Sequence, residues 1–116
     1  MSDNLYRGYA NCNGHLHFAT TDADQTLVTA GATTEQLFIT KIFVTIKTSA
    51  AQSITFEDSA SSAVYVCKVP SNPTVDTQYK FEFTDRGVGL TVGKNLVMNV
   101  SAAGVAGHVE WEGYRK

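Results

Sequence analysis

The sequence is poor in charged residues. Only 17% of its 116 residues are charged, below the ~25% of an average soluble domain, and 9 basic against 11 acidic side chains give a net charge of -2. A chain so nearly balanced lacks the basic surface that neutralises nucleic-acid phosphates or anionic lipid headgroups. We therefore expect neither nucleic acid nor a membrane among its partners.

Long apolar runs are also missing. No stretch approaches the ~20 apolar residues that a membrane-spanning helix needs. The polar residues 1–14 show no basic segment followed by an apolar one, which is the pattern of an export signal. We expect a soluble protein that is made in the cytoplasm.

Cysteine is scarce, and its spacing excludes the usual cysteine-based sites. Cys12 and Cys67 lie far apart and form no CxxC pair, so the sequence predicts neither a disulfide framework nor a structural zinc site. We expect both thiols to be reduced, with Cys67 as a small core side chain. No metal and no cofactor is expected.

The residues that are abundant favour β-structure. Thr occurs 14 times and Val 12 times, whereas Leu occurs only 6 times, and no segment keeps a helical apolar period beyond two turns. Segments rich in β-formers are separated by short polar turns and cover residues 16–21, 26–29, 36–48, 53–58, 63–69, 78–84, 88–92, 95–102 and 105–114.

Parallel strands would need helical crossovers for which the chain has no room. The pattern therefore predicts an all-β fold, an antiparallel β-sandwich of the jelly-roll kind with about eight to nine strands. A chain of this length is expected to form one domain. We assign residues 15–116 to the sandwich and residues 1–14 to an irregular N-terminal arm.

The longest segment, residues 36–48, leads to a prediction about partners. If it is one regular strand, Leu37, Ile39 and Phe43 lie on the face opposite to Ile42 and Val44. Both faces are then largely apolar, whereas a sandwich strand is normally apolar on one face only. We expect the second face to be covered by the N-terminal residues or by another subunit, so Leu37, Ile39 and Phe43 are predicted interface residues.

Residues 87–95, GVGLTVGKN, are similar to a phosphate-binding P-loop but lack its essentials. Val88 stands where the GxxxxGK motif requires glycine, and Asn95 replaces the Ser or Thr that binds Mg²⁺. The segment predicts a hairpin turn instead, with Gly93 able to adopt a positive φ.

Two rows of polar side chains are candidates for metal binding. His15 and His17 share one face of an extended segment, and His108, Glu110 and Glu112 form a second row. Either row alone offers too few ligands for a metal ion, and such rows are typical of the solvent-exposed face of a strand. A cupin-like metal enzyme would need His15, His17, His108 and a glutamate to converge.

Other catalytic patterns are missing from the sequence. It has no GxSxG elbow, and Glu82, Glu110 and Glu112 are expected on outer strand faces, where they act as ordinary surface acids. We expect no catalytic residue and no enzyme activity.

Aromatic residues leave an alternative function open. The side chains of Tyr6, Tyr9, Tyr65, Tyr114 and Trp111 could form a stacking surface for sugars, with acidic residues as hydrogen-bond acceptors. A carbohydrate-binding module, or a receptor-binding module of a phage tail or fibre tip, is therefore the alternative to a purely structural role.

A series of motifs runs in order from Thr26 to Tyr114. A strand carrying Ile39, Ile42, Val44 and Ile46 is followed by an Ile-Thr-Phe strand at 54–56 and a loop with prolines. A G-x-x-L-x-x-G-x-x-L segment at 87–96, a V-S-A-A-G-V-x-G-x-V segment at 100–109 and an aromatic last strand complete the series. This order resembles that of small structural proteins of tailed-bacteriophage particles.

The resemblance implies a non-enzymatic virion protein, most simply a capsid decoration or cement protein. Such proteins often form homotrimers on the major capsid protein or another virion protein. Multivalent binding then lets several weak contacts add up to strong attachment. Under this hypothesis the arm, with Leu5, Tyr6 and Tyr9 as apolar anchors, becomes ordered on assembly. The protein is then located in the virion, which is assembled in the host cytoplasm.

Overall fold

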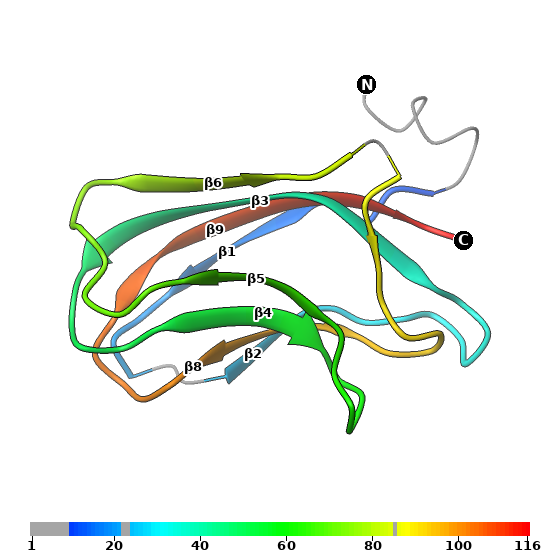
Figure 1. The fold of residues 1–116 in the computed structure, drawn as a ribbon, viewed down its shortest axis with the longest axis horizontal. Helices are drawn as coiled ribbons and strands as arrows, with labels where there is room; N and C mark the ends of the chain where they lie inside the picture. The colour runs from blue at the N-terminus through cyan, green and yellow to red at the C-terminus, as the bar shows by residue number, and fades with distance from the viewer. Residues whose placement is uncertain (1–9, 22–23, 85) are drawn as a thin grey trace.

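The computed structural model describes residues 10–21, 24–84 and 86–116, which form two antiparallel sheets packed face to face (Figure 1). The described residues contain nine strands: β1 (Gly14–Phe18), β2 (Asp24–Val28), β3 (Leu37–Thr48), β4 (Ile54–Asp58), β5 (Tyr65–Val69), β6 (Gln78–Glu82), β7 (Val88–Gly89), β8 (Leu96–Val100) and β9 (Ala106–Arg115). Every predicted segment overlaps one of them. The predicted all-β sandwich is confirmed.

The strand order is that of a jelly roll. Sheet A has the order β1-β9-β3-β6, with the two-residue β7 also pairing with β3, and sheet B has the order β2-β8-β4-β5. The first strand thus lies beside the last, and the second lies beside the last but one, as in two interlocked Greek keys. Among the described residues no helix is long and apolar enough to cross a membrane.

The core lies between the two sheets and follows from the period of two in each strand. On β8, for example, Leu96, Met98 and Val100 are buried while the residues between them are partly exposed. Burying each such side chain contributes about 1.5–3 kcal/mol to folding. The largest wholly buried side chains are Phe56, Leu37, Ile39, Ile42, Ile46, Ile54, Leu90, Leu96 and Met98.

The prediction that Leu37 and Ile39 face outward is wrong. The register with β9 shifts between Ile39 and Lys41, so Thr40 is one extra residue in β3, a β-bulge. The bulge reverses the alternation, and Leu37 and Ile39 point into the core beside Ile42, each with 0% of its surface exposed. They are covered by their own chain and are not available to a partner.

Phe43 does lie on the outer face of sheet A, as predicted. It is partly buried, and it shares that face with Lys41, Thr45 and, beyond the bulge, Phe38. The outer face of β3 is therefore mixed rather than largely apolar, because the bulge removes two of its three expected apolar members.

The predicted turn at Gly93 is present, but it does not close a hairpin. Gly93 has a φ of 79°, and a Cβ atom there would lie 2.6 Å from the Thr33 carbonyl oxygen, so only glycine fits. The turn leads from β7 in sheet A to β8 in sheet B. It is therefore a link between the two sheets.

The sandwich also includes residues that were predicted to belong to the arm. Asn11 forms a β-bridge with Tyr114, and the Cys12 amide donates to the Gly113 carbonyl oxygen at 3.0 Å. Cys12 itself is buried in the core. The domain thus includes residues 11–14, whereas Leu5, Tyr6 and Tyr9 lie outside the described residues.

Candidate functional site

The outer face of sheet A carries the polar and aromatic side chains that the sequence had marked. In the register of the sheet, His15 of β1 pairs with Glu110 of β9, Glu110 pairs with Phe43 of β3, and Phe43 pairs with Lys80 of β6. Because the four positions lie on one line across the sheet, their side chains share its outer face. The sequence alone did not bring these four residues together.

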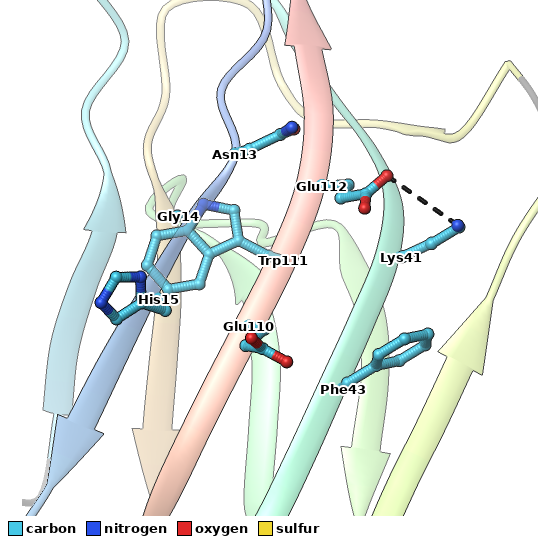
Figure 2. A pocket seen from close by; sticks show the side chains of 8 residues that line it. All are labelled: Asn13, Gly14, His15, Lys41, Phe43, Glu110, Trp111 and Glu112. Carbon is cyan, nitrogen blue, oxygen red and sulfur yellow. Dashed lines mark ion pairs between the residues drawn. The ribbon is translucent and has the colours of Figure 1, made fainter. Parts of the chain in front are cut away.

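A pocket of about 360 Å³ opens on this face between β1, β9 and β3 (Figure 2). The strands that form it are paired through their backbones, with the bulge at Thr40 as an irregularity beside the pocket, so its walls belong to the sheet itself. Its lining consists of Asn13, Gly14, His15, Lys41, Phe43, Glu110, Trp111 and Glu112.

The charged groups around the pocket nearly balance. Lys41 Nζ lies 3.9 Å from Glu112 Oε1, and both side chains are more than a third exposed, so solvent screens this ion pair. Glu110 is exposed and has no hydrogen-bond or ion-pair partner among the described residues. The Lys80 ammonium lies 6.0 Å from the centre of the Phe43 ring.

Trp111 is not the exposed stacking platform that the sequence suggested. It is 6% exposed, and its indole nitrogen donates to the Cys12 carbonyl oxygen at 2.8 Å. Its ring occupies the space left by Gly14, where an added Cβ would lie 2.5 Å from the indole. Trp111 therefore closes the wall of the pocket but has no free ring face for a ligand.

The predicted tyrosines contribute little to the pocket. Tyr114 stacks on Phe38 with ring centres 4.9 Å apart, and its hydroxyl donates to the Arg86 carbonyl oxygen at 2.9 Å. Tyr65 is 59% exposed, but it lies on β5 in sheet B. Tyr6 and Tyr9 fall outside the described residues.

Three histidine rings meet next to the pocket. The ring centres of His17 and His108 are 4.4 Å apart and stacked, and His15 lies 5.8 Å from His108 and 6.5 Å from His17. The histidines thus converge as a cupin-like site would require. However, in the described part of the chain no three His, Cys, Asp or Glu side chains are placed to hold a metal ion.

Neither cysteine is activated as a nucleophile. Burial raises the pKa of the Cys12 thiol to about 11, with a smaller opposing effect of the Arg115 charge, and burial raises the pKa of Cys67 to about 12. Both thiols therefore stay protonated near neutral pH, and the thiol is a poor nucleophile. Cys67 is buried in the core, as predicted.

Asp58 is a buried acid that the sequence analysis did not single out. It is 2% exposed, and its carboxylate accepts hydrogen bonds from the amides of Ala60, Val64 and Thr91 at 3.0, 3.1 and 2.8 Å. Burial raises its pKa, but the hydrogen bonds from Thr91, Ala60 and Val64 outweigh burial, so the pKa lies below its usual value. Asp58 therefore joins the β4–β5 turn to the segment between β7 and β8, which links the two sheets.

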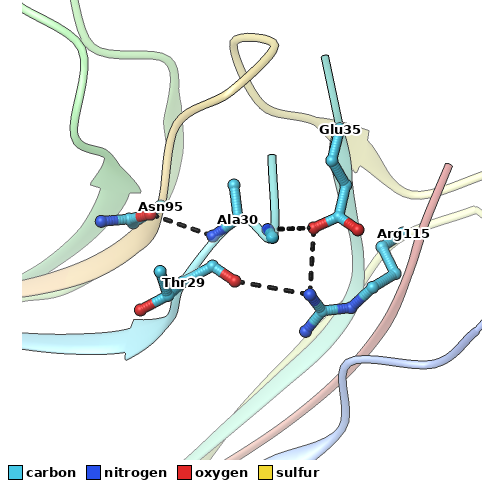
Figure 3. Close-up of polar contacts among 6 residues, drawn as sticks. Thr29, Ala30, Glu35, Asn95 and Arg115 are labelled. Carbon is cyan, nitrogen blue, oxygen red and sulfur yellow. Dashed lines mark hydrogen bonds and ion pairs between the residues drawn. The ribbon is translucent and has the colours of Figure 1, made fainter. Parts of the chain in front are cut away.

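A second polar cluster fastens the β2–β3 connection (Figure 3). Glu35 forms an ion pair with Arg115 of β9 at 3.0 Å, and the Gly31 amide donates to the same carboxylate. The Asn95 side-chain oxygen accepts from the Ala30 amide at 3.0 Å. These contacts satisfy backbone groups of a loop, so we assign them a structural role.

No protein-family model, curated protein or solved structure matches the chain.

Proposed function

We propose that the chain is a non-enzymatic structural protein of a bacteriophage particle, a capsid decoration protein that binds the major capsid protein as a homotrimer. Jelly rolls are common in viral capsid proteins, although the same fold also serves lectins and cupins. Particular residues and surfaces of this chain support the proposal.

The motifs behind the resemblance lie at positions that determine this fold. Gly87 and Gly104 have φ values of 76° and 133°, which residues with a side chain rarely adopt. Leu90, Val105 and Val109 are at most 1% exposed. The resemblance is thus carried by turns and core positions of the sandwich.

Several groups with reactive potential have structural roles. The thiols are protonated and buried, the Asp58 carboxylate accepts from three backbone amides, and the indole of Trp111 is hydrogen-bonded within the chain. A domain of this kind acts through its surface rather than through a reactive group. This favours binding over catalysis.

The edge of sheet A at β6 is the observation that carries the proposal. Within the described residues β6 pairs with β3 alone, so its second side is an open edge. Its inward residues Tyr79 and Phe81, and Phe83 just after it, pack on the core but stay only partly buried. An open strand edge beside half-covered aromatic rings is a surface on which a strand of another subunit can add.

The backbone at this edge offers hydrogen-bonding groups to a partner. The Phe83 amide donates to the Thr40 carbonyl oxygen, and the Ile46 amide donates to the Thr77 carbonyl oxygen. The backbone groups of the odd-numbered residues within 77–83 therefore bond to β3. By alternation, the amides of Lys80 and Glu82 point away from the sheet. Under the proposal these amides pair with the shell protein or with a sister subunit.

Replacing Glu82 with proline tests the proposal. Proline removes only an outward amide and is tolerated on edge strands, so we expect Glu82→Pro to fold normally. Glu82→Ala is the matched control because it removes the same side chain and keeps the amide. The measurement is co-sedimentation of the protein with phage particles assembled without it, together with the mass of the oligomer in solution.

We expect the wild-type and Glu82→Ala proteins to sediment with the particles and to be trimers. We expect Glu82→Pro to bind at least about tenfold more weakly, as the loss of a hydrogen bond in each of several copies implies. Equal binding of all three proteins would show that the β6 edge is not used. A wild-type protein that never sediments with the particles would overturn the proposed function.

A further inference from the structure

We propose that the pocket on the outer face of sheet A is a binding site for a neutral carbohydrate. This inference does not depend on the place of the protein in a phage particle, because it concerns a different surface from the β6 edge. It follows from the size of the pocket, its aromatic wall and its balance of charge.

The size of the pocket fits a small saccharide. Ligand sites in proteins usually measure about 300–1,000 Å³, and the pocket, at about 360 Å³, lies at the lower end of that range. One or two sugar rings fill such a volume, whereas a large cofactor does not fit. The pocket opens on the face of the sheet, so a longer glycan can extend beyond it.

The aromatic wall is provided by Phe43. Its ring is partly buried, lines the pocket, and stands between Glu110 on one neighbouring strand and Lys80 on the other. The face of an aromatic ring is electron-rich and attracts weakly positive C–H groups. The C–H face of a pyranose offers such groups, so Phe43 supplies the apolar contact that a sugar requires.

The polar wall is provided by Glu110, Glu112 and Lys41. Ionised carboxylates are pure acceptors and the ammonium is a pure donor, so the three side chains can hold a row of sugar hydroxyls, which both donate and accept. Hydrogen bonds from hydroxyls to a carboxylate are among the strong ones. Glu110 has no competing partner among the described residues, and the contact of Glu112 with Lys41, at 3.9 Å, is loose.

The charge balance favours a neutral ligand over a charged one. The lining carries two carboxylates, of Glu110 and Glu112, and one ammonium, of Lys41, while Lys80 lies outside the lining beside Phe43. An anionic ligand meets the two carboxylates, and a cationic ligand meets the ammonium of Lys41. A polyhydroxylated ligand without charge is repelled by neither.

The arrangement favours binding rather than hydrolysis of the sugar. Glycosidases place two carboxyl groups on opposite sides of the bond that they cleave. Here Glu110 and Glu112 project from the same strand, β9, and line the same side of the pocket (Figure 2). We therefore infer a carbohydrate-binding site and no glycosidase.

A glycan array followed by titrations with methyl glycosides of neutral hexoses and with neutral disaccharides tests the inference. The titrations are followed by the backbone amide NMR shifts of the full chain. We expect neutral glycans to bind and to shift the amides of residues 41–43 and 110–112. Glu110→Gln keeps the shape of an exposed side chain, and we expect it to weaken binding about tenfold because a charge-assisted hydrogen bond is lost.

Phe43→Ala is expected to abolish binding, and Glu82→Gln is the control. Glu82 lies on the same face two strands away from Glu110, and it does not line the pocket. We expect this variant to bind like the wild type. The inference is overturned if no neutral glycan binds, if only charged glycans bind, or if Glu110→Gln binds as tightly as Glu82→Gln.

Discussion

Replacing Gly113 with alanine is expected to lower the free energy of unfolding by about 3 kcal/mol or more, because overpacking against backbone cannot be relieved by side-chain rotation. Gly113 lies in β9, opposite the bulge in β3. A Cβ atom there would lie 2.2 Å from the Phe38 carbonyl oxygen and 3.0 Å from Cys12 Sγ. The two central strands of sheet A would have to move apart.

Gly31→Ala is the matched control for Gly113→Ala. At Gly31 the nearest atom to an added Cβ is a Glu35 carboxylate oxygen at 3.3 Å, which is the end of a flexible side chain. We expect this exposed variant to change stability by less than about 0.5 kcal/mol. Urea unfolding of the three proteins measures the difference, and a Gly113→Ala protein as stable as the Gly31→Ala protein would refute the described pairing of β3 with β9.

Replacing Asp58 with asparagine is expected to lower the free energy of unfolding by about 3 kcal/mol at neutral pH, because hydrogen bonds to a buried charged group are lost. The carboxylate accepts from three backbone amides, of Ala60, Val64 and Thr91. An asparagine side chain carries one acceptor oxygen and turns an NH₂ group toward these donors. The β4–β5 turn and the link between the sheets should both loosen.

The effect of Asp58 on stability depends on pH in a definite direction. Its pKa in the folded protein lies below the usual value, because the hydrogen bonds from Thr91, Ala60 and Val64 favour the ionised form and outweigh the effect of burial. Its contribution is therefore fully present above about pH 4 and is lost as the pH falls through the lowered folded pKa. We expect the stability difference between the wild type and Asp58→Asn to shrink below pH 4.

Asp76→Asn is the control for the pH series. The Asp76 side chain is 75% exposed, and its ion pair with Lys47 at 3.3 Å lies in solvent. Asp76 has a φ of 60°, which asparagine also tolerates. Thermal unfolding between pH 2 and 7 should show that Asp76→Asn loses stability on acidification as the wild type does. An equal loss of stability on acidification for Asp58→Asn would contradict the role assigned to Asp58.

The strands could be predicted from the sequence because their signals are local. Alternation of apolar and polar residues and the turn residues between segments placed all nine strands within a few residues. The bulge at Thr40 was missed, although a signal for it was present. The apolar positions Leu37 and Ile39 are out of phase by one residue with Ile42, Val44 and Ile46, which is what an inserted residue produces.

The candidate site could be predicted only in part. The outward orientation of Glu110, Glu112 and Phe43 followed from alternation within single strands. The pocket depends on β1 lying beside β9 and β9 beside β3, pairings between the first, the last and a middle strand. Such long-range pairing is set by packing of the whole chain and leaves no local pattern in the sequence. The meeting of His15 and His17 with His108 was not predictable for the same reason.

The proposed function is attachment to a phage particle. The most direct measurement is quantitative mass spectrometry of gradient-purified particles from cells that carry the gene. We predict that the chain is present at a fixed ratio to the major shell protein and stays bound through the gradient. Particles free of the chain, with the protein recovered only from the soluble fraction of the same cells, would contradict the account.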